Sequence, residues 1–157
     1  MKKLAPVALL IASLVGCSSV PQVNWQQGSQ ITMNQVNVEL KSNLWVNLMP
    51  AIEEEPVQDV QDVQELSIQG ALYLEGDKQL PANLTAEALI IKQGTTEWMI
   101  DGGDLETRTH SENQWEVTFT WQVEADTDKS VDLALLLDDA GKQRWLVEKH
   151  VKINKVY

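Results

Sequence analysis

A two-residue hydrophobic period runs through most of the chain from residue 34 onward and constrains its fold more than any other feature. Successive side chains of a β-strand point to opposite faces, so alternating apolar and polar residues indicate a strand with one buried face. The cleanest alternation places polar residues between Trp115, Val117, Phe119, Trp121 and Val123. This pattern predicts a strand whose aromatic and aliphatic side chains face a core.

Similar segments recur, separated by turn-forming sequences rich in glycine and aspartate. We expect strands over residues 36–40 and 44–48, with a slip in the alternation near Ser42-Asn43, and over 66–74, 86–91, 97–100 and 131–137. Apolar residues also occupy the intervening positions of 131–137, which indicates a central strand covered on both faces.

The last predicted strand begins after the turn Asp138-Asp139-Ala140-Gly141. The side chains that we expect to face the core are Trp145, Val147, Val151 and Ile153. The side chains that we expect to face outward are Lys142, Arg144, His150 and Lys152. Lys149 breaks this alternation and indicates a bulge or an exposed strand end.

Seven to eight short strands without a long helical period predict an all-β fold, an antiparallel β-sandwich of immunoglobulin-like or transthyretin-like arrangement. One domain over residues 31–157 accounts for the length. An acidic insertion at about 50–65 interrupts the strands, and its valines recur every three residues. That spacing suits either a short helix lying on the sandwich or an irregular solvated loop.

The first 16 residues have the pattern of an export signal: a basic start at Lys2-Lys3, then an apolar run of about 12 residues that is too short to span a bilayer. The run ends in Leu14-Val15-Gly16-Cys17, which resembles the lipobox of bacterial lipoproteins. The resemblance covers residues 1–19 and implies that the signal peptide 1–16 is removed and that Cys17 becomes the lipid attachment site.

The same resemblance implies a location, since Ser18 follows the cysteine where lipoproteins retained in the inner membrane often carry aspartate. We therefore expect a Gram-negative outer-membrane protein, lipid-anchored on the periplasmic face. Residues 17–30 are polar and lack apolar periodicity, so they predict a flexible tether that reaches about 43 Å when extended. Acylation of the chain's single cysteine leaves no thiol for disulfides, catalysis or metal binding.

Charge is distributed unevenly along the chain. Without Lys2 and Lys3 the mature chain has ten basic and 23 acidic residues, a net charge of −13, which argues against nucleic acid as a partner. Five bases and one acid nevertheless lie between Lys142 and Tyr157. Two explanations stay open: these bases protect an edge strand from pairing with other chains, or they recognise an anionic partner.

The sequence carries no catalytic or cofactor signature, and we expect neither an enzyme nor a bound cofactor or metal. The two histidines, His110 and His150, lie far apart and match no zinc spacing. Trp45 is out of phase with its apolar neighbours, which favours an exposed ring suited to stacking on a ligand. The candidate partner-binding residues are Trp45, Arg144, His150 and Lys152.

Three functions follow in order of support from the sequence. The first is a lipid-anchored periplasmic accessory module that docks to another envelope protein or complex. The second is a module that binds a glycan, peptidoglycan or lipopolysaccharide, through exposed tryptophan and the basic terminal strand. The third and least supported is a small hydrolase, which would require histidines or carboxylates to converge in a cleft.

Overall fold

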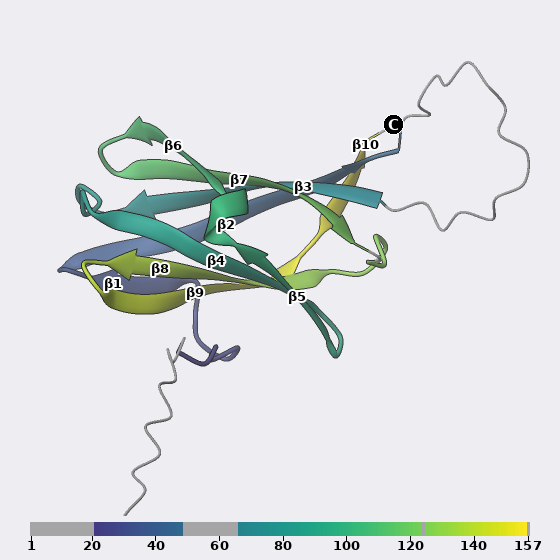
Figure 1. Cartoon of the computed structure of the whole chain (residues 1–157), viewed down its shortest axis with the longest axis horizontal. Helices are drawn as coiled ribbons and strands as arrows, with labels where there is room; N and C mark the ends of the chain where they lie inside the picture. The colour runs from purple at the N-terminus through teal and green to yellow at the C-terminus, as the bar shows by residue number, and fades with distance from the viewer. Residues whose placement is uncertain (1–20, 49–65, 124, 157) are drawn as a thin grey trace, which may run out of the picture.

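The computed structural model describes residues 21–48, 66–123 and 125–156. In these segments ten strands and one short 3-10 helix build two packed sheets (Figure 1), and the predicted all-β antiparallel sandwich is confirmed. The expected signal peptide, Cys17 and the insertion at 50–65 lie outside the described residues.

The first sheet has the strand order β1 (Gln30–Met33), β2 (Val36–Asn47), β3 (Leu66–Gly76), β7 (Gln114–Val123) and β6 (Glu106–Ser111). The second has the order β5 (Thr96–Asp101), β4 (Leu84–Gln93), β8 (Val131–Asp139) and β9 (Lys142–Val151). A final strand, β10 (Ile153–Val156), leaves β9 and joins the first sheet as a parallel neighbour of β2.

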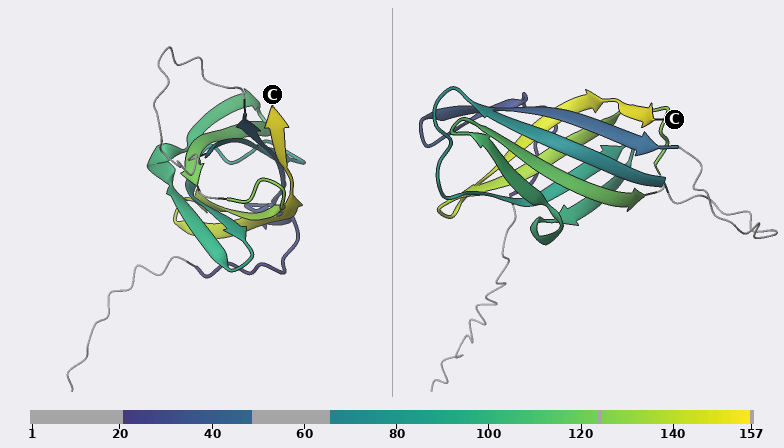
Figure 2. Two further views of the ribbon diagram at one scale, coloured as in Figure 1. Left: turned by 90° about the vertical axis from the view of Figure 1, so that its right-hand side faces the viewer. Right: turned by 90° about the horizontal axis from the view of Figure 1, so that it is seen from above.

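The chain crosses between the sheets on both sides of the sandwich. On one side the 3-10 helix η1 (Gly102–Asp104) connects β5 to β6, and on the other β9 continues through Lys152 into β10. The end-on view in Figure 2 shows both sheets curving around a shared interior. Because both edges carry such crossings, the sheets bend toward each other there.

Ten strands exceed the seven to eight expected, and β1, β6 and β10 account for the difference. All six residues of β6 are exposed, so it lacks the apolar alternation that would reveal it in the sequence. β1 and β10 have four residues each, too few for a clear period. These strands are held by pairing with β7 or β2, a long-range interaction.

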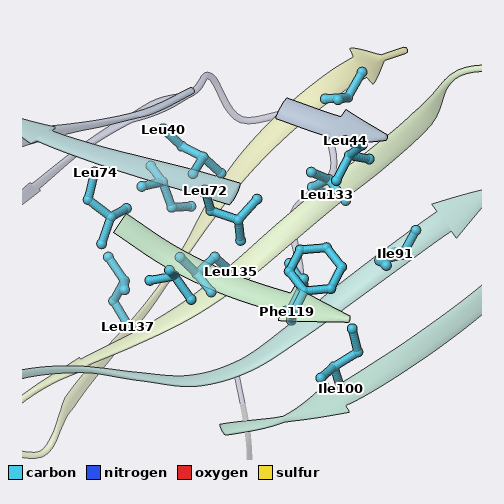
Figure 3. Close-up of a cluster of buried hydrophobic side chains, with 14 of the residues drawn as sticks. Leu40, Leu44, Leu72, Leu74, Ile91, Ile100, Phe119, Leu133, Leu135 and Leu137 are labelled. Carbon is cyan, nitrogen blue, oxygen red and sulfur yellow. The ribbon is translucent and has the colours of Figure 1, made fainter. Parts of the chain in front are cut away.

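The interior between the sheets is an aliphatic core around Phe119, with leucines and isoleucines from both sheets directed toward one another (Figure 3). The predicted inward face of β7 is confirmed: Val117 and Phe119 are buried, while Trp115 and Trp121 are partly buried against the same cluster. Phe119 pairs across the strands with Gly70, and its ring fills the space that a side chain at Gly70 would need.

The slip that we expected near Ser42-Asn43 is wrong, because β2 is one continuous strand. Leu40 and Leu44 both face the core, and Ser42 occupies the inward position between them, half-buried. A single polar residue at an inward position looks like a break in the sequence pattern, although the backbone continues unchanged.

The inward orientation expected for Trp145 and Val147 is also wrong. Leu146, between them, enters the main core, while Trp145 and Val147 are buried on the outer face of the second sheet. Val151 and Ile153 face the main core as expected. Three consecutive apolar residues are buried because both faces of β9 are covered, and a period of two cannot distinguish the faces there.

The irregularity expected at Lys149 is present. Val131 pairs with Val151 and Leu133 with Glu148, so β9 carries one extra residue at this point and forms a bulge. His150 within it adopts a left-handed backbone with φ of 58°, and its N–H donates to Oδ1 of Asp132 at 3.0 Å.

Residues 21–29 contain no regular strand or helix, as expected for the tether, but they lie against the second sheet rather than free of it. Val23 and Trp25 pack on an outer apolar cluster formed by Ala88, Ala134, Leu136, Trp145 and Val147. Nε1 of Trp145 donates to the carbonyl of Pro21, and Nε2 of Gln27 donates to the carbonyl of Trp145 at 2.5 Å. We call Pro21–Gln27 the strap; Figure 1 shows it in purple beneath β9.

Candidate functional site

An open groove of about 860 Å³ lies on the outer face of the first sheet. Its lining residues include Trp45 from β2, Gln69 from β3, a run of β7 side chains, and Glu106 and Arg108 from β6. Because outward side chains on a strand recur every second residue, these groups are the polar counterparts of the core residues below them.

Strand register explains how these residues come together. Trp45 pairs with Gln69, which pairs with Thr120, and one row further along Thr118 pairs with Glu106. Four neighbouring strands at about 4.8 Å spacing place the β2 and β6 walls roughly 14 Å apart.

Trp45 stands on one wall with its ring fixed in orientation. Its Nε1 donates to Oε1 of Gln69 at 3.0 Å, and the ring is only partly exposed. An indole held by a hydrogen bond loses less conformational freedom when a ligand stacks on it. This wall can therefore offer a flat apolar face beside an amide.

The opposite wall is charged. Nη2 of Arg108 lies 3.4 Å from Oε1 of Glu106, and both side chains are well exposed. Behind them Nε2 of His110 lies 2.7 Å from Oε2 of Glu116, and the His110 ring is 6.4 Å from that of Tyr73. An exposed pair such as Arg108–Glu106 contributes little to stability, about 0–1 kcal/mol, so its donors and acceptors can turn to a ligand at small cost.

The groove presents an aromatic face, amides, hydroxyls, carboxylates and a guanidinium, groups that can form stacking contacts and hydrogen bonds. Within the described residues no three His, Cys, Asp or Glu side chains converge as metal ligands. Glu148, whose pKa burial raises above the ordinary value of 4.5, lies elsewhere, on β9 near Ser42 of β2.

The structure separates the four candidate residues from the sequence. Trp45 lies in the groove, whereas Arg144 lines a smaller hollow of about 350 Å³ beside Met33, Asn34 and Lys142. His150 and Lys152 lie near the other end of β9, roughly 20 Å from Arg144 along the strand. The basic terminal segment is therefore spread along the molecule instead of forming one site.

Sequence reasoning missed Gln69, Glu106, Arg108 and Glu116 as members of a common site. Polar residues alternate with apolar ones along every strand, so the sequence does not distinguish them from ordinary solvated side chains. Only the pairing of β2, β3, β7 and β6 brings them into one row.

Comparisons with known proteins give no relative for this fold or sequence: no protein-family model matches the chain, and no curated protein or solved structure matches it significantly. None of the described segments forms a helix with the length and hydropathy of a membrane span.

Proposed function

We propose that this protein is a lipid-anchored, non-enzymatic binding module of the bacterial cell envelope that docks to another envelope protein through the groove of the first sheet. The lipobox resemblance at Leu14–Cys17 supports the anchor and the outer-membrane, periplasmic location. The observation that carries the docking role is the groove itself, bordered by β6, an edge strand with all six residues exposed.

An edge strand beside a groove suits an extended polypeptide. Unpaired N–H and C=O groups of an edge can accept a further strand, and the side chains of that strand can enter the neighbouring groove. Glu106 and Arg108 would then set the charge that a partner must match. This arrangement gives binding energy from the backbone and specificity from the groove.

Glycan binding is the second candidate, favoured by the Trp45–Gln69 pair. A sugar ring presents a C–H face that stacks on indole and hydroxyls that bond to amides and carboxylates, and the groove offers all of these groups. Its width of roughly 14 Å fits one or two sugar rings or one peptide strand.

Photo-crosslinking in intact envelopes tests the docking role. A photoreactive residue at Thr120, on the groove floor, is expected to capture one defined protein, and the same residue at Gln143, an exposed position on β9, is the matched control. Glu106→Arg should abolish the Thr120 crosslink. Capture that is equal from both positions, or unchanged by Glu106→Arg, would reject the groove as the docking site.

Fluorescence titration tests whether the groove binds a glycan. Peptidoglycan or lipopolysaccharide fragments should shift tryptophan emission in the wild type and not in Trp45→Phe, with Trp25→Phe as the control on the other sheet. A flat titration of the wild type would eliminate glycan binding.

A further inference from the structure

The strap leaves part of an apolar surface open on the outer face of the second sheet. Met99 of β5 is 51% exposed, one of two large apolar side chains that are exposed in the part of the chain that the structure describes, and it pairs across the strands with Ile90. Both border a hollow of about 390 Å³ that also includes Pro21, Trp25 and Lys92. We call these five residues the strap patch.

The strap patch combines apolar and cationic groups in one place. Nζ of Lys92 lies 5.0 Å from the ring centroid of Trp25, a cation–π arrangement that holds the ring at the surface. Tryptophan and lysine beside aliphatic side chains is the combination found at the boundary between lipid head groups and acyl chains. Glu97, which lines the same hollow, favours a shallow position at head-group depth.

The length of the chain determines what this patch can reach. Three residues separate Cys17 from Pro21, and four steps of at most about 3.6 Å span no more than roughly 14 Å. Pro21 and Gln27 are both hydrogen-bonded to Trp145 of β9. The docked strap therefore keeps Cys17 within roughly 14 Å of the point where Pro21 contacts the second sheet. A free tether over residues 17–30 would allow the domain to lie about 43 Å from the lipid. With the strap docked, only the short segment before Pro21 separates the domain from the lipid.

We infer that the strap patch is a membrane-contact surface, which rests on the head groups of the bilayer that anchors Cys17. The inference rests on the proposed lipid anchor and adds an orientation to it. The second sheet faces the bilayer, and the groove, on the outer face of the opposite sheet, points away from it. A protein that binds in the groove would therefore approach from the side of the domain that faces away from the anchoring membrane.

Site-specific labelling tests this orientation. Acylation consumes the Cys17 thiol, so Met99→Cys in the mature lipoprotein provides a single site for an environment-sensitive NBD dye. Thr120→Cys, exposed on the groove floor, is the matched control. When the labelled protein is added to phosphatidylcholine vesicles, we expect a blue shift and quenching by brominated lipid at position 99 and neither at position 120.

The outcomes separate the two proposals. If the protein does not float with the vesicles, the lipid anchor itself is refuted. If it floats and the two labels respond alike, or only position 120 responds, the anchor stands and the orientation is refuted. A label-free measurement gives a second check: brominated lipid should quench intrinsic tryptophan emission less in Trp25→Phe than in the wild type, while Trp45→Phe should retain the full quenching.

Discussion

The packing of Phe119 on Gly70 gives the most direct test of how this core is built. Phe119 is 5% exposed and lies directly across from Gly70, where a Cβ would come within 2.3 Å of a ring carbon. The Phe119→Ala change should lower the free energy of unfolding by about 3–5 kcal/mol, near the upper end because glycine offers no side chain to fill the space.

The reverse perturbation is Gly70→Ala, which forces a methyl group into the ring. Overpacking of this kind costs about 1–3 kcal/mol. The two costs should not add, because removal of the ring makes room for the methyl group. In the Phe119→Ala background the methyl group meets mainly Cδ2 of Leu44, which lies 2.8 Å from the Cβ position, so Gly70→Ala should cost less than in the wild type, with a coupling energy of about 1–3 kcal/mol between positions 70 and 119.

Urea denaturation followed by far-ultraviolet circular dichroism measures all four proteins. With a slope of about 2 kcal/mol per molar urea, a loss of 4 kcal/mol lowers the midpoint by about 2 M. Thr120→Ala, exposed on the other face of β7, is the control and should stay within about 0.5 kcal/mol of the wild type. Strictly additive losses, or a harmless Gly70→Ala in the wild type, would refute the packing described above.

Three further predictions concern the anchor, the strap and a half-buried acid. Cys17→Ala should leave full-length precursor that no longer floats with outer membranes; a mature-sized floating species would contradict the lipobox assignment. Trp25→Ala should uncover Trp145 and increase binding of the dye ANS, with little change expected from the surface control Gln143→Ala. Burial raises the pKa of Glu148 in the folded protein above 4.5, so the folded state holds the proton more tightly; the contribution of this group to stability should be fully present below about pH 4.5 and fall as pH rises through the raised pKa. Glu148→Gln should flatten that fall and raise the melting temperature at pH 7, and an unchanged pH profile would show that the group is solvated.

The raised pKa of Glu148 has a structural cause that the sequence does not show. Glu148 follows Val147 on β9 and points toward β2, where desolvation is the main effect, Glu39 adds to the rise and Ser42 partly offsets it. From the sequence, Glu148 is one more carboxylate in an acidic chain. The approach of β9 to β2 is what makes it distinct.

The sequence by itself determined seven of the ten strand-forming segments, all but β1, β6 and β10, and, where one face is buried, which side chains face the core. Val117 and Phe119 were placed correctly because apolar and polar side chains must alternate along a strand with one buried and one solvent-exposed face. The bulge near Lys149 and the central position of β8 also followed from local pattern. These are properties of a few consecutive residues, and local chemistry is enough to specify them.

Tertiary structure alone decided the pairing of strands and the covering of outer faces. Trp145 lies on the outer face because the strap covers it there. The two contacting residues, Pro21 and Trp145, are more than 100 residues apart in the sequence, so local periodicity does not show this contact. The exposed strand β6 exists because β7 pairs with it, and the groove exists because β2, β3, β7 and β6 are neighbours. The physical reason is that alternation reports only whether a side chain is buried, while the identity of what buries it depends on contacts between distant parts of the chain.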